Sequence, residues 1–358
     1  MNSLFEPLEF KHGPRMKNRF MLAPLTNSQS HEDGVLSEDE FNWLTMRAKG
    51  GFGLTMTCAA HVQAHGKGFP GQLGIFDNKH TEGLKRLADA IKREDSVSIC
   101  QLHHAGMRSP AEIIKQPPVC PSDNEELGAR ALSKSEVEEV VEDFIAAATR
   151  AARAGFDGVE LHGAHGYLLC QFFSGETNRR EDEYGGNLTN RSRILFEIID
   201  GIRQQCHSNF MIGVRLSPER FGMKLDDSVE LAQRLCVEAK IDFLDMSLWD
   251  VFKEPNEEER QGRSLLSYFS SIERGEVRLG VAGKIRTPTD AERVFAEGID
   301  WIMLGRAAIL HHNFPALMQQ DRNFLPTENP VSREYLANEG LSEKFINYMS
   351  SWKGFVAE

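Results

Sequence analysis

Residues 135–162 read SEVEEVVEDFIAAATRAARAGFDGVELH, and this stretch decides the fold because it holds one complete helix followed by one strand. In its first part, apolar side chains recur at intervals of three and four residues, which places them on one face of a helix. Ser135 and Glu138 have the spacing of a capping box, and Gly155 stands where a glycine commonly ends a helix. The second part, Gly158–His162, is short and largely apolar, as in a strand buried on both faces.

The same alternation of strand and helix recurs along the whole chain. The expected strands are Phe20–Pro24, Gly53–Ala59, Val97–Leu102, Gly158–His162, Phe210–Leu216, Ile241–Ser247, Val277–Gly283 and Trp301–Leu304. The expected helices are Ser37–Lys49, a segment from Thr81, Ser135–Ala154, a segment from Thr189, Asp226–Ala239, Ser264–Arg274, a segment from Thr287 to Gly298, and Arg306–Gln320. Strict alternation predicts an α/β fold with a parallel sheet, and eight units favour a closed (β/α)8 TIM barrel. No GxGxxG follows a strand, which disfavours a Rossmann fold.

The composition excludes several classes of function. The chain has 358 residues, 41 Lys and Arg against 53 Asp and Glu, and a net charge of −12, which disfavours nucleic acid or an anionic membrane as a partner. No apolar run approaches the ~20 residues of a spanning helix, and the first residues do not resemble a signal peptide. The six cysteines contain no CxxC pair, so we expect reduced thiols and a cytoplasmic protein.

The chain is expected to divide into two parts. Residues 1–320 should form the barrel, and residues 321–358 a C-terminal tail that packs on the barrel or on a neighbouring subunit of a homo-oligomer. Three connections exceed ordinary loop length, and all three follow the carboxyl ends of strands: His103–Lys134, Gly163–Leu188 and Leu248–Arg263. Barrel enzymes build their active sites from such loops, so we expect long loops around the site at this face.

Cationic side chains stand at the ends of three expected strands. Arg215 ends the fifth strand, where a buried guanidinium needs a partner, either a barrel carboxylate or a bound anion. Gly283-Lys284 and Gly305-Arg306 end the last two strands, where barrels commonly bind phosphate. The joint position of these two pairs on the last two strands indicates a phosphorylated ligand.

The densest cluster of polar residues is His162-Gly163-Ala164-His165-Gly166-Tyr167. Two neutral imidazoles can donate hydrogen bonds to one carbonyl oxygen, and Tyr167 keeps its proton at pH 7 and can act as a general acid. The alternative for the two histidines is a zinc site, which needs a third ligand. Gln101 and Thr26, also at strand ends, offer an amide and a hydroxyl to a polar ring edge.

These residues resemble one known family in its own order along the chain, from about residue 4 to 310. The chain resembles the old yellow enzymes, FMN-dependent NAD(P)H:flavin oxidoreductases. The matching stretches are Asn18-Arg19-Phe20, Ala23-Pro24-Leu25-Thr26, Gln101-Leu102-His103-His104-Ala105-Gly106, His162 to Leu168, Asp182-Glu183-Tyr184-Gly185-Gly186-Asn187, Asn190-Arg191, Val214-Arg215 and Leu304-Gly305-Arg306.

The resemblance implies FMN at the mouth of the barrel. Thr26 would bond the flavin C4 carbonyl, Gln101 the pyrimidine edge, and Arg215 would lie by N1 and the O2 carbonyl. The remaining cofactor residues would line the ring (Pro24, Leu25 and Ala59) or hold the phosphate (Gly283, Lys284, Gly305 and Arg306). The chain departs from part of the family in combining Thr26 with two histidines, because some relatives with that pair carry cysteine at this position.

The resemblance also implies a ping-pong reaction of an ene-reductase. NADPH or NADH would reduce the flavin, and an α,β-unsaturated carbonyl or nitro compound would then take its place and accept the hydride. His162 and His165 would bind the oxygen of this activated alkene, and Tyr167 would protonate its α-carbon. No metal is implied. A flavin-binding protein without turnover is the remaining alternative, and replacement of Tyr167 would distinguish it.

Overall fold

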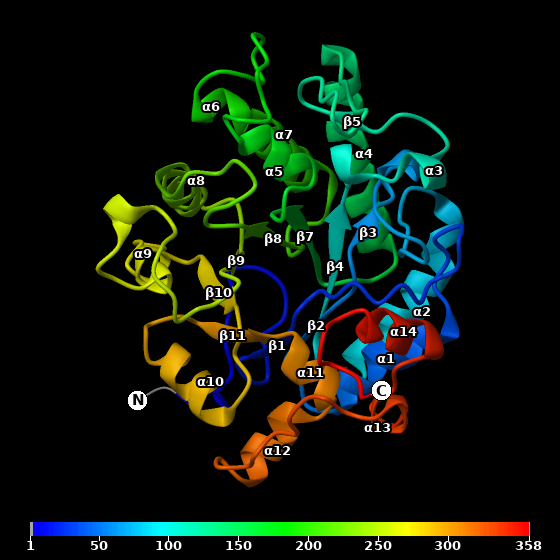
Figure 1. Cartoon of the computed structure of the whole chain (residues 1–358), viewed down its shortest axis with the longest axis vertical. Helices are drawn as coiled ribbons and strands as arrows, with labels where there is room; N and C mark the ends of the chain where they lie inside the picture. The colour runs from blue at the N-terminus through cyan, green and yellow to red at the C-terminus, as the bar shows by residue number, and fades with distance from the viewer. Residues whose placement is uncertain (1–2, 358) are drawn as a thin grey trace.

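A computed structural model describes residues 3–357, and its centre is a closed parallel barrel (Figure 1). The strand order is β2-β1-β11-β10-β9-β8-β7-β4, and β2 also pairs with β4, which closes the ring. The eight strands are β1 (Phe20–Leu22), β2 (Leu54–Met56), β4 (Val97–His103), β7 (Gly158–Gly163), β8 (Met211–Leu216), β9 (Phe243–Ser247), β10 (Arg278–Ala282) and β11 (Trp301–Leu304). The expected TIM barrel is therefore confirmed.

Helices surround the barrel and cover its outer face (Figure 1). The α-helices are α1 (Glu38–Lys49), α2 (Thr81–Lys92), α3 (Ala111–Ile114), α4 (Lys134–Arg153), α5 (Leu168–Phe173), α6 (Leu188–Arg191), α7 (Arg193–Gln205), α8 (Leu225–Glu238), α9 (Leu265–Ser270), α10 (Pro288–Phe295), α11 (Arg306–Leu310), α12 (Phe314–Gln320), α13 (Arg333–Asn338) and α14 (Glu343–Ser350). Short strands β3 (Ala60–His61), β5 (Val119–Cys120) and β6 (Arg130–Ala131) lie in the loops.

The cap of the long helix α4 differs from the expectation. The chain carries the capping-box spacing twice, and Ser133 with Glu136, not Ser135 with Glu138, makes the cap. The Ser133 hydroxyl accepts from Glu136 N, and the Glu136 carboxylate accepts from Ser133 N at 2.8 Å. The helix does end before Gly155, whose φ of +86° suits a glycine.

The expected strand Gly53–Ala59 is shorter in the structure, because only β2 lies within it and β3 begins after it. Two expected helices are each two pieces, and the helix from Thr189 is α6 and α7. The helix Arg306–Gln320 breaks into α11 and α12 because His311 leaves the helical conformation and Pro315 begins a new first turn. The other expected helices differ from those observed mainly at their ends.

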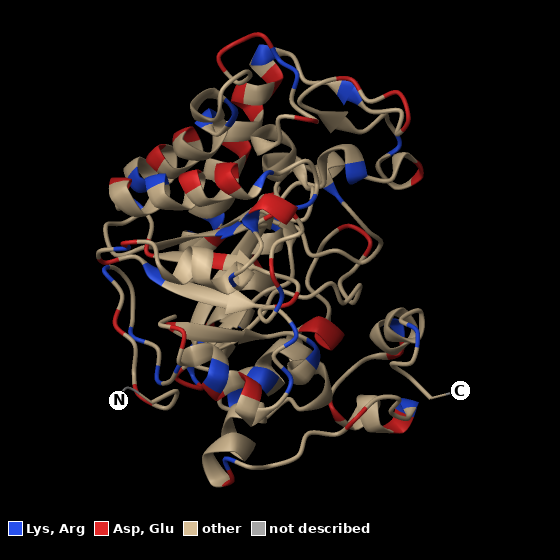
Figure 2. Cartoon of the chain, turned by 60° about the vertical axis from the view of Figure 1, so that its left-hand side comes forward, with Lys and Arg blue, Asp and Glu red and all other residues tan. Residues whose placement is uncertain are grey.

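The core has two parts, one inside the barrel and one outside it. The inner cluster fills the amino-terminal half of the barrel with large side chains such as Met21, Met211, Phe243 and Trp301. The outer cluster lies between the strands and the helices. Charged side chains mark the outer helices, whereas the barrel strands carry few of them (Figure 2). This packing leaves the carboxyl ends of the strands free to form a site.

The C-terminal segment returns to the barrel of its own chain. Helices α13 and α14 follow α12, and Tyr348, Met349 and Trp352 reach the cavity at the barrel mouth. The Ser342 amide donates to Gln29 Oε1 at 3.1 Å, which ties α14 to the loop after β1. All six cysteines are free thiols. A search of the described residues found no helix with the length and apolar character to cross a membrane.

Candidate active site

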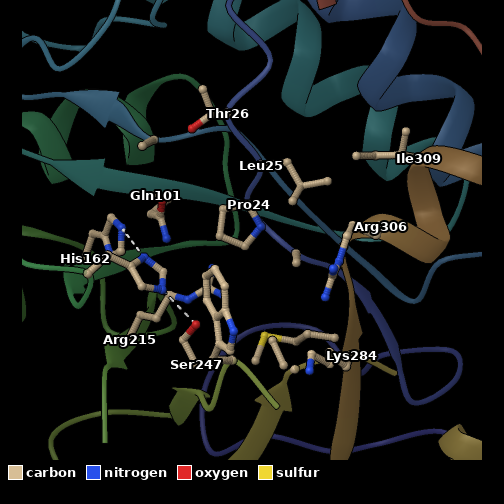
Figure 3. Close-up of a pocket in the computed structure, with 18 of the residues that line it drawn as sticks. Pro24, Leu25, Thr26, Gln101, His162, Arg215, Ser247, Lys284, Arg306 and Ile309 are labelled. Carbon is tan, nitrogen blue, oxygen red and sulfur yellow. Dashed lines mark hydrogen bonds between the residues drawn. The ribbon is translucent and has the colours of Figure 1, made fainter. Parts of the chain in front are cut away.

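One cavity of about 300 Å³ at the barrel mouth gathers every residue that the sequence placed at the site (Figure 3). Its lining includes Pro24, Leu25, Thr26, Ala59, Gln101, His162, His165, Tyr167, Arg215, Gly283, Lys284, Gly305 and Arg306. These residues come from or directly follow β1, β2, β4, β7, β8, β10 and β11, because the carboxyl ends of parallel strands meet at one end of the barrel. The structure thus brings the whole predicted set together.

One side of the cavity is strongly cationic. Lys284, Arg286 and Arg306 all line it, and Lys284 Nζ lies 2.8 Å from Asp250 Oδ2. Within residues 3–357, neither Arg286 nor Arg306 forms an ion pair. Burial, and secondarily repulsion from Arg286, lowers the pKa of Arg306, and Asp250 opposes the shift, so the two guanidiniums lie close enough to repel each other. Such a group suits a dianion.

The backbone at this side is open to a ligand. Gly283 has a φ of +154°, and a Cβ there would meet Asp250 N at 2.9 Å, so only glycine fits. Gly305 precedes α11, and a Cβ there would meet only the Leu25 side chain, at 3.3 Å. Both glycines therefore keep the chain close to the cavity wall beside the cations.

The opposite side carries the histidine pair. His162 lies at the end of β7, and His165 follows in the left-handed conformation with a φ of +60°. His162 Nε2 and His165 Nδ1 are 3.3 Å apart, and His165 Nε2 lies 2.7 Å from Ser247 Oγ (Figure 3). Burial, with repulsion from neighbouring cationic groups, holds the pKa of both imidazoles well below the usual value, so both rings are neutral at pH 7.

Tyr167 stands beside this pair with its proton retained. Burial is the main cause that raises the pKa of its hydroxyl, although Arg108 opposes the shift. The Arg108 guanidinium lies 4.6 Å from the centre of the Tyr167 ring, and the His103 ring packs edge to face against it at 4.3 Å between centroids. These contacts hold the phenol in the cavity lining.

Arg215 forms an ion pair with a barrel carboxylate, which was one of the two partners expected for it; the other was a bound anion. Its Nε lies 3.4 Å from Asp245 Oδ2 on β9, and both side chains are buried. Glu160 on β7 accepts a hydrogen bond from Gln101 Nε2 at 2.7 Å. Burial, together with the charge of Asp245, raises the pKa of Glu160, and burial also raises the pKa of Asp245 to about 6, although Arg215 opposes that rise. Arg215 nevertheless lines the cavity, so its ion pair does not close the site.

Sequence reasoning missed part of the lining. Ser247 ends a predicted strand, and Trp249 and Arg286 follow predicted strands, but none of them was assigned a role. Tyr348 and Met349 belong to the tail. The sequence could have placed Glu160 and Asp245 near the site. Each stands two residues before a cavity residue, His162 and Ser247, and alternate strand residues share a face.

No group of three or more His, Cys, Asp and Glu side chains in the described part of the chain is arranged to hold a metal.

The barrel, its cationic end and its neutral histidine pair define a TIM-barrel oxidoreductase that uses a phosphorylated cofactor. The model of the NADH:flavin oxidoreductase / NADH oxidase family matches residues 3–324. The chain belongs to this family, and within it to the old yellow enzymes, and it uses FMN and NAD(P)H.

The similar proteins agree with this membership. A protein of Bacillus subtilis, named as a probable NADH-dependent flavin oxidoreductase, is 36% identical over 89% of this chain and 88% of its own length. The old yellow enzyme homologue of Zymomonas mobilis has a TM-score of 0.81 at 26% identity and covers 97% of this chain and 99% of its own. A NADH:acrylate oxidoreductase of Vibrio harveyi is 32% identical over 87% of this chain, which spans only 32% of that relative.

The residues present fit FMN. Arg286 and Arg306 lie at the cationic end and form no ion pair within residues 3–357, and Gly283 and Gly305 open the backbone beside them. The wall between this end and the histidines is largely apolar, with Pro24, Leu25, Ala59 and Met303, and suits an aromatic ring system.

Proposed function

We propose that this enzyme reduces the activated C=C bond of α,β-unsaturated carbonyl or nitro compounds by a ping-pong mechanism. Bound FMN would supply the redox chemistry, taking two electrons and a proton from NADH or NADPH and passing them to the alkene. The observation that carries the proposal is the convergence of two neutral imidazoles and one protonated phenol on a single cavity with a cationic far end.

The site residues would divide the work in the following way. Lys284, Arg306 and the glycines Gly283 and Gly305 would hold the cofactor phosphate. Gln101, Thr26 and Arg215 would meet the polar edge of its ring system. Pro24, Leu25 and Ala59 would line the ring.

The histidine pair would bind and polarise the substrate oxygen. Neutral imidazoles each carry one N–H, and the contacts with Ser247 and between the rings fix how the rings point. Hydrogen bonds to a carbonyl oxygen withdraw electron density from the conjugated alkene and stabilise the charge that develops on that oxygen. Neutrality matters here, because a protonated pair would repel Arg215 and its neighbours.

Tyr167 would deliver the proton to the α-carbon. Its buried hydroxyl keeps the proton at neutral pH, and it lies beside His162, with 5.2 Å between ring centroids, so it would be near an oxygen bound by that histidine. Replacement by phenylalanine removes only the hydroxyl. We expect Tyr167→Phe to lose reduction of weakly activated alkenes while reduction by NADH or NADPH persists.

The test separates the two halves of the reaction. FMN-loaded protein is reduced anaerobically with NADH or NADPH while its absorbance is followed, and 2-cyclohexenone is then added. Reoxidation with formation of cyclohexanone supports the proposal. Reduction without any reoxidation by a panel of enones and nitroalkenes contradicts it and leaves a flavin reductase or a flavin-binding protein.

A further inference from the structure

A second cavity of about 300 Å³ opens beside the histidine pair, and we call it the mouth pocket. It shares His165, Tyr167, Ser247, Trp249 and Tyr348 with the cofactor cavity. Its other lining residues are Arg108, Ser217, Pro218, Glu219, Arg220, Phe221 and Leu248. A substrate that places its carbonyl oxygen at the histidines therefore extends into a pocket with two arginines.

Neither arginine of the mouth pocket has an acidic partner. Arg108 donates from Nη1 to the carbonyl oxygen of His165 and lies over Tyr167. The Arg220 guanidinium lies 5.1 Å from the ring of Trp249 and 5.4 Å from that of Phe221. Among the side chains of residues 3–357, no carboxylate forms an ion pair with either guanidinium.

The one acidic residue in the wall is already engaged. Glu219 is buried and forms an ion pair with Lys253, and its Oε2 accepts from the Asn256 amide at 2.7 Å. Both oxygens of Glu219 are therefore used, and its charge is matched by the lysine. The two arginines keep their positive charge for a ligand.

Arginines dominate the charge around the histidine pair. After burial, the largest causes that lower the pKa of His165 are Arg215 and Arg108, and Arg220 also contributes. Arg215 pairs with Asp245, and Glu219 with Lys253, so within residues 3–357 Arg108 and Arg220 are the arginines at this end that form no ion pair. This local field is opposite in sign to the net charge of −12 of the chain. An anion that enters is attracted over the whole width of the mouth pocket.

The pocket wall also holds strained backbone. Arg220, Phe221 and Trp249 have φ values of +71°, +56° and +62°, in the region that side chains other than glycine rarely adopt. Trp249 remains 62% exposed although its ring is large and apolar. Strained backbone at three residues of one cavity, with the Arg220 guanidinium near two aromatic rings, is typical of a binding surface.

The cofactor phosphate does not account for these arginines. Arg286 and Arg306 follow β10 and β11, whereas Arg108 follows β4 and Arg220 follows β8. Figure 3 shows Lys284 and Arg306 on the side of the cavity away from His162. Arg108 and Arg220 are therefore available to bind a second anionic group, apart from the phosphate of FMN.

We propose that Arg108 and Arg220 bind a carboxylate of the substrate, so that this enzyme prefers α,β-unsaturated carbonyl compounds that carry a negative charge. Guanidiniums bind carboxylates through charge-assisted hydrogen bonds, and Trp249 and Phe221 supply an apolar wall for the carbon skeleton. The inference rests on the proposed function, because it specifies the alkene that the same histidines and tyrosine act on. Arg108 lies against Tyr167, so the carboxylate belongs close to the reacting carbons.

The test uses an acid and its methyl ester, and it compares their ratio between variants, so that the intrinsic reactivity of the two alkenes cancels. The kcat/KM values of FMN-loaded enzyme are measured for (E)-4-oxo-2-pentenoate and for its methyl ester, in wild type and in Arg220→Gln. We expect wild type to prefer the acid, and we expect the acid-to-ester ratio to fall about tenfold in the variant. Arg220→Lys, which keeps the charge, should retain most of the preference. Arg322→Gln, an exposed arginine paired with Glu292, is the matched control.

The outcomes separate this inference from the proposed function. If neither compound is turned over, the proposed function fails. If both are turned over and Arg220→Gln does not change their ratio, only the carboxylate site is wrong. If the variant instead slows reduction by NADH or NADPH and leaves the ratio intact, the arginines bind the phosphates of the dinucleotide, and the carboxylate proposal is overturned. Higher ionic strength should lower kcat/KM for the acid and leave the ester unaffected.

Discussion

Replacing Asp245 with asparagine should destabilise the FMN-free protein far more than replacing Glu160 with glutamine. Asp245 Oδ2 lies 3.4 Å from Arg215 Nε, and both groups are buried. At an effective dielectric constant of about 20, two unit charges at this separation attract by about 5 kcal/mol. Removing one partner of a buried pair costs about 3–5 kcal/mol, because the other charge is left uncompensated.

Glu160 is the matched control because we assign the proton of this pair of acids to it: Asp245 faces Arg215, and burial with the charge of Asp245 raises the pKa of Glu160. Its Oε1 accepts from Gln101 at 2.7 Å, and a glutamine oxygen can accept the same bond while its amide donates toward Asp245 in place of the carboxyl proton. We therefore expect Glu160→Gln to cost less than about 1 kcal/mol. Both variants replace a carboxylic acid with its amide. A difference between their losses of stability therefore shows which of the two acids carries the charge.

The assay is urea unfolding of FMN-free protein at pH 7, followed by circular dichroism, for wild type and both variants. The expected order of stability is wild type close to Glu160→Gln, with Asp245→Asn well below. Equal losses in the two variants, or a larger loss in Glu160→Gln, would refute this assignment of the charge. The reduction potential of bound FMN gives an independent reading: it should rise in Asp245→Asn, where Arg215 is no longer neutralised, and stay close to wild type in Glu160→Gln.

Three further predictions follow from single features. Ser247→Ala removes the 2.7 Å contact with His165 Nε2 and should lower kcat for enones about tenfold, while flavin reduction by NADH, measured alone, is little changed. Gly283→Ala would place a Cβ 2.9 Å from Asp250 N and should weaken FMN affinity at least tenfold by fluorescence titration; unchanged affinity would show that the loop yields. Burial lowers the pKa of His61 and His80 to about 4 and that of His103 to about 3. The unfolded chain binds protons on these rings below about pH 6.5 while the native state does not, so stability is full above that pH and falls toward pH 4 by up to about 1.4 kcal/mol per pH unit per histidine. Urea midpoints that stay constant from pH 7 to 4.5 would contradict this.

The barrel strands could be predicted because each is a short apolar run, followed in the sequence by an amphipathic helix. Arg215, Lys284 and Arg306 could be assigned to the mouth because they end such runs, and the carboxyl ends of parallel strands share one edge. Element ends were less accurate. The Ser-x-x-Glu spacing occurs at both Ser133 and Ser135, and nothing local to the sequence decides between them.

The remaining site residues depend on contacts that the sequence does not show. Tyr348 and Trp352 lie in the tail, far along the chain from the residues they join, and only the return of α14 to the barrel brings them into the cavity. Arg108 and Arg220 sit in long loops, where no periodic pattern fixes the backbone. Their significance rests on the absence of an ion pair within residues 3–357, which is a property of the folded arrangement.

The central claim is that one cavity holds FMN at its cationic end and an activated alkene at His162, His165 and Tyr167. The most direct measurement is an anaerobic titration of FMN-loaded protein with NADH and then NADPH, followed by one equivalent of 2-cyclohexenone. The account predicts that flavin absorbance near 450 nm disappears with at least one donor and returns as cyclohexanone forms. Failure of the protein to take up FMN, or a reduced flavin that no enone or nitroalkene reoxidises, would contradict it.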